Sequence, residues 1–533
     1  MARPKREAST SPSQSAKKVK KEEPDDAVRS PSTSKAETSV ASSLARWDPS
    51  VKLPDDANWP APASDMKKAK NFIERLLPGS EDSLNITSDR PLVILPDKDA
   101  DGLSSSLILH RTLIHLGLSE ECIVIHHLSK GTNPASHSEV EAVKAHKPRA
   151  VILLDQGSRP GPPLLGEGDD TPVMVIDHHF LKPGEEGPQG SLMINASHSP
   201  PIATSSLLTW TICRPLWQDP AEAEKVIDWL AVLGTAGDLS VNVPWDPPWP
   251  DLAPEMKKWS KKRIGTAIAL LNAPRRTPDF NVSLAYRSLL SSTTPLELLD
   301  PAQNKQAREL YALRSAVSEE AERCTHTPPK FAKDGRLAVL FIDSPFQVHP
   351  GIATRWSGAL RGAKNLQVVM CANKGYSPHG THTHFSCRRA GAALKRGENP
   401  NIIELLHDYA ARDPTFLSDV VKVEAELERA GSGELSTGDE EPPNVDVKTE
   451  GGDDESKAVE ALNFARGHRE ASGGILPHAL FDRFVQLMEI GVPSEKKPDS
   501  PSKKKSMPEQ KTKLTSFFGV KPSGAGPDKG KAA

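Results

Sequence analysis

The sequence contains few cysteines, no long apolar run and no strong net charge. Its five cysteines are widely spaced and include no Cys-x-x-Cys pair, which excludes a disulfide framework and a zinc finger. No apolar stretch approaches the roughly 18 residues of a membrane span, and the N-terminus lacks the apolar region of a signal peptide. The net charge of −3 gives no overall basic field. We therefore expect a protein of a reducing compartment, without a membrane segment.

Composition divides the chain into folded and disordered parts. The two ends are rich in Ser, Lys, Glu and Pro, the composition of disordered segments. Residues 1–21 carry seven Lys or Arg against one Glu, and residues 491–533 carry ten Lys against four acidic residues, so both ends are cationic. We predict disordered tails over 1–45 and 491–533, folded domains over 46–310 and 311–490, and a disordered acidic insert at about 429–457.

Between the tails, short apolar runs alternate with helix-like segments. The runs PLVILPD, CIVIHHLS, AVILLDQG and PVMVIDHH begin near residues 91, 122, 150 and 172, and each has the length of a strand buried on both faces. The helical spacing between them predicts a parallel sheet. A long helix over Asp300–Arg323 should lead into a second α/β region that begins at GRLAVLFIDS and ends near Met488. The expected fold is α/β, with a parallel-sheet domain joined by this helix to a smaller α/β domain.

Acidic and histidine residues follow the ends of four segments of the first domain. They are Asp97, Asp99 and Asp101, then Asp155, then Asp177, His178 and His179, and finally Asp238 at the end of a helix. Because the ligand crevice of an open parallel sheet lies beyond the carboxyl ends of its strands, we expect these groups to converge. Carboxylates and imidazoles suit a pair of divalent metal ions, which would relieve the repulsion among the aspartates and activate a water.

Each of these residues also has a plainer interpretation. Asp155 or Asp238 alone is typical of a turn or a helix cap. Asp101 before a glycine is typical of a tight turn, and His178 with His179 can be a structural pair. Only the whole set favours a metal site, because four independent acidic ends in this order are hard to obtain by chance.

The motifs PDKDADG, LLDQG, VIDHH and GTAGD resemble the four successive motifs of the DHH phosphoesterase superfamily, and the D-x-D-x-D-G form of the first resembles the RecJ nuclease branch. Leu95 stands where small-substrate members often have a histidine, which also favours that branch. The resemblance implies two Mn²⁺ or Mg²⁺ ions, with ligands at Asp99, Asp101, Asp155, His178 and Asp238 and with Asp97 as a further participant. It also implies that His179 faces the substrate phosphate and that Asp177 orients the histidines.

The second region resembles the DHH-associated domain of RecJ-like nucleases, in which a basic residue and a Gly-Gly loop bind the nucleic-acid strand. Arg388 in FSCRR and Gly473 with Gly474 match that pattern. The family's Gly-Gly-His is Gly-Gly-Ile here, and His478 follows four residues after Gly474. Without the family context, a loop turn with surface arginines is the plainer interpretation.

Short motifs in the polar segments predict a location and partners. Lys17, Lys18 and Lys20 resemble a nuclear localisation signal, and KTKLTSFF resembles a PCNA-interacting peptide with Leu514, Phe517 and Phe518 as its apolar plug. Val-Lys-x-Glu tetrads at Lys20, Lys422 and Lys448 resemble SUMO acceptor sites.

These observations predict a metal-dependent phosphodiesterase. We expect a RecJ-like exonuclease on single-stranded DNA or RNA that acts in nuclear replication or repair and is tethered to PCNA. Two alternatives stay open, namely a non-catalytic replication scaffold of the same fold, and a phosphodiesterase of short oligonucleotides or small phosphodiesters.

Overall fold

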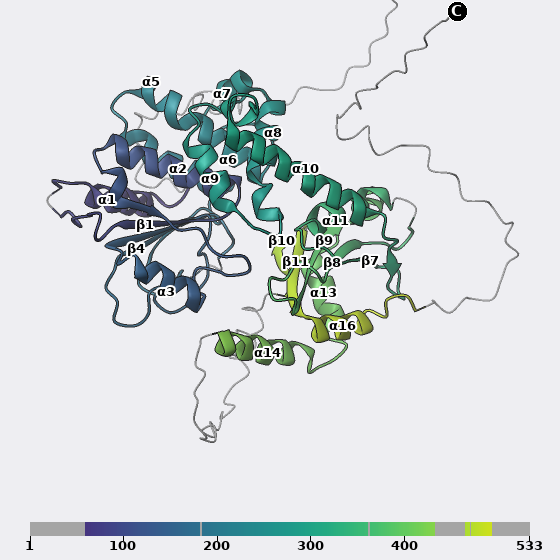
Figure 1. Ribbon diagram of the computed structural model, residues 1–533. Coiled ribbons are helices and arrows are strands. Elements are labelled where there is room, and N and C mark those ends of the chain that lie inside the picture. The colour runs from purple at the N-terminus through teal and green to yellow at the C-terminus, as the bar shows by residue number, and fades with distance from the viewer. Residues whose placement is uncertain are drawn as a thin grey trace, which may run out of the picture. The chain divides into compact units, whose positions relative to one another are not determined.

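The computed structural model describes residues 59–80, 82–181, 184–360, 363–431, 464–468 and 471–492, with the backbone alone for 424–431 and 466–468. The chain divides into two compact units between Ser318 and Glu319 (Figure 1). Within the described ranges, no helix is both long enough and apolar enough to cross a membrane.

Several predicted features lie outside the described residues. They are the basic N-terminal tail, most of the acidic insert and the C-terminal tail, and with them Lys17, Lys18, Lys20, Lys448, Leu514, Phe517 and Phe518. Lys422 is described and lies exposed on helix α14 (Phe416–Gly431).

The first unit contains a five-stranded parallel sheet in the order β2-β1-β3-β4-β5. Its strands are β1 (Leu92–Pro96), β2 (Ile123–Ile125), β3 (Ala150–Leu154), β4 (Val173–Asp177) and β5 (Leu192–Asn195). Every residue of β1, β3 and β4 is buried, which explains their continuous apolar runs. The predicted parallel α/β fold is confirmed. The sequence analysis missed β5, whose residues are mostly half-buried.

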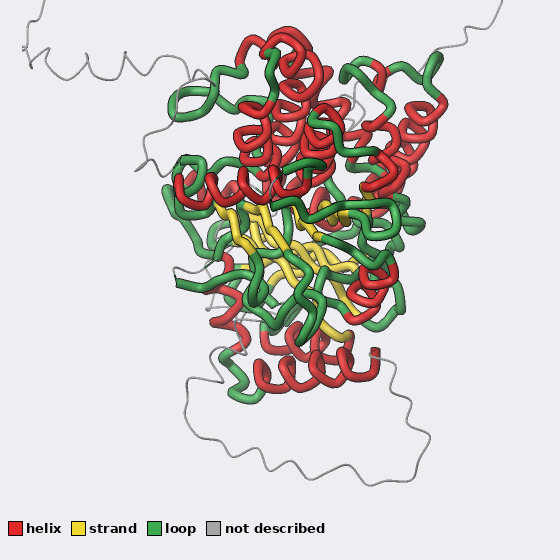
Figure 2. Tube along the Cα trace, turned by 90° about the vertical axis from the view of Figure 1, so that its left-hand side faces the viewer, coloured by secondary structure: helices red, strands yellow, loops and turns green. Residues whose placement is uncertain are grey.

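Helices cover both faces of this sheet (Figures 1 and 2). One face shares a large apolar core with α1 (Ala63–Leu76), α2 (Ala100–His115), α4 (Ser205–Cys213) and α6 (Trp229–Asp238). The other face packs on α3 (His137–Ala145) and the loop that contains Leu164 and Leu165. Alternate residues of each strand therefore enter different cores.

The remaining helices of the first unit follow α4 in the chain. They are α5 (Pro220–Ala223), the π-helical turn η3 (Glu224–Asp228), α7 (Ala253–Trp259), α8 (Lys261–Leu271), α9 (Val282–Leu290) and α10 (Lys305–Thr325), which continues past Ser318 into the second unit. Short 3₁₀ turns are η1 (Glu120–Cys122), η2 (Arg214–Leu216), η4 (Pro274–Arg276) and η5 (Glu297–Leu299). The predicted long helix is α10, but it begins at Lys305 because Asp300 forms a turn by accepting hydrogen bonds from the amides of Ala302 and Gln303.

The second unit contains a six-stranded mixed sheet in the order β10-β11-β9-β8-β7-β6, in which only β7 and β8 pair in parallel. Its strands are β6 (Lys330–Phe331), β7 (Leu337–Ile342), β8 (Val368–Asn373), β9 (His382–Arg389), β10 (Arg466–His468) and β11 (Ala471–Pro477). Its helices are α11 (His349–Ala359), α12 (Gly391–Lys395), α13 (Ile402–Ala410), α14 and α16 (His478–Leu487). Helices α13, α14 and α16 share an apolar core with the sheet.

Candidate metal centre

The first predicted motif turns the chain from β1 into α2. Asp99 is the N-cap of α2, and its side chain accepts hydrogen bonds from the amides of Asp101 (3.0 Å) and Gly102 (3.3 Å). A Cβ atom on Gly102 would lie 2.6 Å from the carbonyl oxygen of Asp97, so the turn is closed too tightly for any other residue. The glycine of the D-x-D-x-D-G motif therefore brings Asp97 and Asp99 close together.

Asp101 points in a different direction, into the protein. Its side chain is 1% exposed, and its two oxygens accept hydrogen bonds from the amides of Ser205 (2.8 Å) and Ser206 (3.0 Å). These amides belong to the first residues of α4, so Asp101 caps that helix from across the core. Burial raises the pKa of Asp101 to about 6, against the opposing charge of His178.

Asp155 lies at the end of β3 in a left-handed backbone conformation with φ of 62°. Such a conformation is strained for a residue with a side chain and is often found at functional sites. Its Oδ1 atom accepts a hydrogen bond from the Ser205 hydroxyl (2.9 Å) and lies 3.2 Å from Nε2 of His178. Burial, followed by the charges of Asp101 and Asp99, raises the pKa of Asp155 well above its usual range.

Asp177 fixes the loop that carries both histidines. Its side chain is fully buried, and it accepts hydrogen bonds from the backbone amides of His178 (2.8 Å), His179 (3.3 Å) and Ser158 (3.0 Å). Its Oδ1 atom also lies 2.7 Å from Nδ1 of His179. Although burial opposes its charge, these hydrogen bonds lower the pKa of Asp177 to about 2. An ionised Asp177 therefore fixes the backbone of both histidines and the ring of His179.

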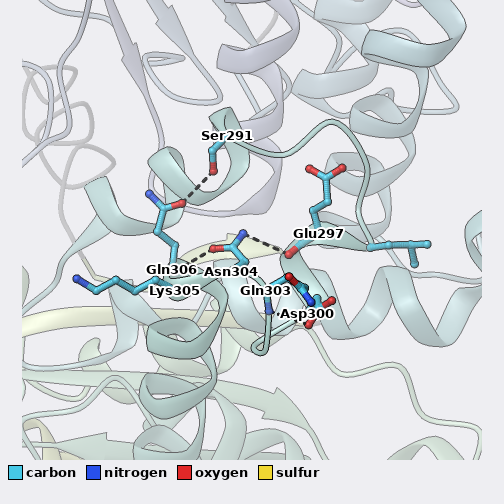
Figure 3. Close-up of a pocket in the computed structure, with 8 residues that line it drawn as sticks. Ser291, Glu297, Asp300, Gln303, Asn304, Lys305 and Gln306 are labelled. Carbon is cyan, nitrogen blue, oxygen red and sulfur yellow. Dashed lines mark hydrogen bonds between the residues drawn. The ribbon is translucent and has the colours of Figure 1, made fainter.

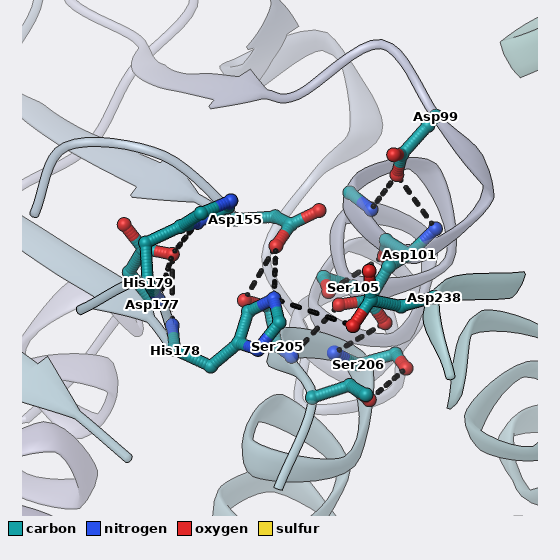
Figure 4. A network of polar contacts seen from close by, with 12 residues as sticks. Asp99, Asp101, Ser105, Asp155, Asp177, His178, His179, Ser205, Ser206 and Asp238 are labelled. Atoms are coloured by element: carbon teal, nitrogen blue, oxygen red, sulfur yellow. Dashed lines mark hydrogen bonds and ion pairs between the residues drawn. The ribbon is translucent and has the colours of Figure 1, made fainter. Parts of the chain in front are cut away.

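His178 connects the remaining acidic residues. Its Nε2 atom lies 3.2 Å from Asp155 and 3.8 Å from Oδ2 of Asp238, the last residue of α6 (Figure 4). A Cβ atom on Gly234 would lie 2.9 Å from an oxygen of Asp101, so the first glycine of GTAGD lets α6 pack against the site. Four segments that are distant in sequence thus meet at one place.

Two groups of side chains have the geometry of a metal site. One comprises Asp97, Asp99 and Asp155, and the other comprises Asp155, His178 and His179, and within each group the donor atoms lie within 4.8 Å of one another. Asp155 belongs to both groups. Oxygen and imidazole donors are the ligands that Mn²⁺ and similar divalent ions accept, and a cation would offset the cost of burying the carboxylates. These residues therefore fit a divalent metal centre.

The two groups differ in part from the ligand set implied by the resemblance. Asp101 is in neither group, and both of its oxygens accept hydrogen bonds from the first amides of α4. Asp238 is also in neither group, and its side chain is 34% exposed. His179, expected to face a phosphate, lies in the second group, where its Nδ1 contacts Asp177 and its Nε2 is the nitrogen available to a ligand.

A model of the DHH family, N-terminal domain, matches residues 91–235. Residues 91–235 form a DHH-family domain. This domain extends from β1 into the last turn of α6 and contains all the predicted metal-centre residues except Asp238. The DHH family predicted from the motifs is thus confirmed for these residues. No curated protein matches the sequence.

Solved structures share the fold at low sequence identity. The crystal structure of RecJ in complex with Mn²⁺ from Thermus thermophilus is 17% identical with a TM-score of 0.51, and the match covers 82% of this chain but 55% of that one. CDC45 from Entamoeba histolytica is 10% identical (TM-score 0.40, covering 80% of this chain and 98% of that one). The pGpG-specific phosphodiesterase PggH from Vibrio cholerae is 11% identical (TM-score 0.33, covering 75% of this chain and 99% of that one). The fold is RecJ-like, and the chain spans about half of the Thermus RecJ chain.

The sequence analysis missed several residues that support the DHH domain's metal centre. Ser205 and Ser206 hold Asp155 and Asp101, and no motif of the sequence marks either serine. Nη2 of Arg275 lies 3.8 Å from Asp99, and Nε of Arg275 donates to Asn272 (3.2 Å). Burial opposes the charge of Asp99, but Arg275 and then Lys98 outweigh it and lower the pKa of Asp99. No sequence pattern links Arg275 to a motif so distant in the chain.

The predicted nucleic-acid-binding residues all lie in the second unit. Gly473 and Gly474 were expected in a loop, but they lie inside β11, opposite Ser386 and Phe385 of β9. A Cβ atom on Gly473 would lie 2.5 Å from the carbonyl oxygen of Phe385, so the glycine permits close pairing of two strands. The expectation of a loop was therefore wrong.

Arg388 and His478 have partners within the second unit. Arg388 lies on β9, and its Nη1 donates to the carbonyl oxygen of Cys387 (2.8 Å), while burial lowers its pKa. His478 begins α16, and its ring nitrogens lie 2.8 Å from the Thr383 hydroxyl and 2.9 Å from the Gly380 carbonyl oxygen. His478 thus fixes the start of α16 against the loop that precedes β9.

A separate surface pocket lies where α9 leads into α10 (Figure 3). Its polar side chains bind one another, since the Ser291 hydroxyl donates to Gln306 (2.9 Å) and the Asn304 amide donates to the carbonyl oxygen of Glu297 (3.3 Å). No residue of the metal centre lines it. The pocket therefore has no part in the site of the DHH domain.

Proposed function

We propose that the protein is a metal-dependent phosphodiesterase that cleaves single-stranded nucleic acid from an end. The observation that carries the proposal is the pair of donor groups that share Asp155 within a DHH-family domain. The RecJ-like fold supports the choice of a nucleic-acid strand as substrate. The second candidate function is the cleavage of short oligonucleotides or small phosphodiesters, which would require the same chemistry at the metal centre.

The side chains of this centre would have different roles. Asp97, Asp99 and Asp155 would hold one ion, and Asp155, His178 and His179 a second. Divalent ions bound there would neutralise the carboxylates, polarise a phosphoryl oxygen and activate a water. The protein itself supplies rigid placement, because Asp155 is held by Ser205, and both histidines are held by Asp177.

A purely structural role for the chain is disfavoured by the same residues. Asp101 and Asp155 are buried, and burial together with the neighbouring acidic groups raises the pKa of each. Burying carboxylates side by side costs stability unless a cation or a function compensates. A scaffold of the same fold has no reason to keep this arrangement.

End-labelled oligonucleotides test the proposal. With Mn²⁺ present, single strands should be shortened stepwise from one end and at least roughly tenfold faster than blunt duplex, since opening one terminal base-pair step costs about 1.4 kcal/mol. Blocking each end of the strand in turn shows from which end cleavage begins. The same experiment on DNA and on RNA shows which of the two is the substrate. Release of internal fragments, or equal rates on duplex and single strand, would contradict the exonuclease proposal.

We also propose that the protein acts in the nucleus, in replication or repair, and binds PCNA through its C-terminal tail. The support for this is the sequence alone, with Leu514, Phe517 and Phe518 as the binding residues and Lys17, Lys18 and Lys20 as the import signal. SUMO attachment at Lys20, Lys422 and Lys448 has the same support, and Lys422 is exposed.

The variant Phe517→Ala/Phe518→Ala should lose PCNA binding and keep its cleavage of short free oligonucleotides. Aromatic hot-spot residues contribute about 2 kcal/mol or more to an interface, so calorimetry should show at least a roughly 30-fold weaker complex. The matched control Pro522→Ala/Ser523→Ala changes the same tail beyond the motif and should bind normally. Undiminished affinity of the double phenylalanine variant would remove the proposed tether.

A further inference from the structure

The two most exposed large apolar side chains among the described residues of the first unit follow directly after His179 and after Asp238, whose Oδ2 lies 3.8 Å from Nε2 of His178. Phe180 is 65% exposed and comes after His179, and Leu239 is 48% exposed and comes after Asp238. The other exposed large apolar residues of this unit, Ile114 and Leu296, are 38% and 37% exposed. Exposure of apolar area costs free energy, so two such residues next in the chain to His179 and Asp238 point to contact with a ligand.

Phe180 is also held firmly by its neighbours in the chain. The Asn195 side-chain amide donates to the carbonyl oxygen of His179 (2.9 Å), and Nε2 of His198 lies 2.5 Å from the carbonyl oxygen of Leu181. The His198 ring packs edge-on against Phe180, with ring centroids 5.8 Å apart. The backbone on both sides of Phe180 is thus fixed, and its ring is presented to solvent at a defined place.

Leu239 is positioned by the packing of α6. Its amide donates to the carbonyl oxygen of Thr235 (3.0 Å), and a Cβ atom on Gly237 would lie 2.8 Å from Cβ of Ala100 at the start of α2. The end of α6 therefore lies against the first turn of α2. We call Phe180 and Leu239 the apolar rim of the metal centre.

We propose that the apolar rim binds a nucleobase of the substrate, with Phe180 stacking on the base next to the phosphate that is cleaved. This inference rests on the proposed function and specifies its substrate as a base-bearing strand. A residue adjacent to His179 lies within about 3.8 Å of it between Cα atoms, so a base on Phe180 belongs to a nucleotide whose phosphate is near the metal centre. Every base has an aromatic face, so the contact favours nucleotides without selecting a sequence.

The alternative ligands fit the rim less well. A small phosphodiester without a ring system has nothing to cover Phe180. A peptide would use backbone hydrogen bonds from a sheet edge or a long groove, whereas the rim consists of two side chains beside a phosphate-cleaving centre. An unpaired base supplies a flat apolar surface that is joined to its own phosphate.

The test combines Phe180→Ala with substrates that lack a base. Single strands carry one abasic residue at the first, second or third nucleotide from the attacked end, and kcat/KM is measured for wild type and variant on each. On the complete strand the variant should lose between about 5-fold and 100-fold, mainly through KM, because stacking contributes this much per base. On the strand that lacks the stacked base, wild type and variant should be equal.

Further variants separate stacking from folding and from general surface effects. Phe180→Trp should restore activity, and Leu239→Ala should cause a smaller loss. Leu296→Ala, which removes an exposed apolar side chain away from the centre, should have no effect. The inference is overturned if Phe180→Ala matches wild type on the complete strand, or loses equally on every abasic strand. Failure of the wild type to cleave any strand would instead contradict the proposed function.

Discussion

Replacing Asp155 by asparagine should lower phosphodiesterase activity by at least about 1,000-fold, because metal ions contribute several kcal/mol to the stabilisation of charge at phosphorus. Asp155 is the one residue that both donor groups contain, so it would help to hold an ion in either group. Loss of its charge should weaken both groups together. This loss of activity is measured as the ratio of the cleavage rates of wild type and variant on an end-labelled single strand at saturating Mn²⁺.

The fold should survive this substitution. Asparagine keeps an oxygen that accepts the hydrogen bond of the Ser205 hydroxyl, and it removes a carboxylate whose pKa burial raises well above the usual range. The metal-free variant should therefore melt no lower than the metal-free wild type. Mn²⁺ should raise the midpoint of the wild type only, because ligand binding stabilises a folded state in proportion to its affinity.

The control for Asp155→Asn is Asp246→Asn, which makes the same chemical change at an exposed position of the same unit. This control should keep its activity and its response to Mn²⁺. Wild-type activity in Asp155→Asn, or an unchanged Mn²⁺ response, would show that Asp155 is not a ligand.

The sequence predicted the sheet of the first unit well because its central strands are buried on both faces. A strand of this kind appears as an unbroken apolar run, and β1, β3 and β4 all have that form. The β5 strand was missed because its residues are mostly half-buried and it has no such run. The meeting of the motif residues was also predictable, since carboxyl ends of parallel strands lie at one edge of a sheet.

The orientation of each side chain was not predictable in the same way. Asp99 and Asp101 are two residues apart, yet one caps α2 and the other caps α4, and only the position of α4 in space decides this. Arg275 reaches Asp99 through the packing of elements that are far apart in the chain. The pattern of a motif thus identifies a site, whereas the roles of its members depend on tertiary contacts.

The same distinction applies to the second unit. The glycine pair was recognised from its sequence, but a strand interior and a loop both accept glycine. The pairing of β11 with β9 explains Gly473 through the close approach of the Phe385 carbonyl oxygen. Strand pairing of this kind depends on a partner 87 residues away in the chain, since Gly473 pairs with Ser386, and local sequence does not reveal it.

Removal of divalent metal should abolish cleavage as completely as the loss of Asp155. After treatment with EDTA and dialysis, the rate on a single strand should fall by at least about 1,000-fold, and Mn²⁺ or Mg²⁺ should restore it. The metal-free protein should stay folded, because the residues of the metal centre are not part of the apolar cores on the two faces of the sheet. Its stability should drop by about 2.7 kcal/mol for each ion removed, relative to protein at a metal concentration 100 times the dissociation constant.

Titration with Mn²⁺ then distinguishes one ion from two. Two donor groups that share Asp155 predict two ions per chain for the wild type. Asp97→Asn affects only the first group and should reduce the number to one, while the second group, with both histidines, keeps its ion. Asp246→Asn should still bind two. Persistent activity after EDTA treatment would contradict a metal-dependent mechanism. A single ion bound to the wild type would contradict the prediction that both donor groups hold an ion.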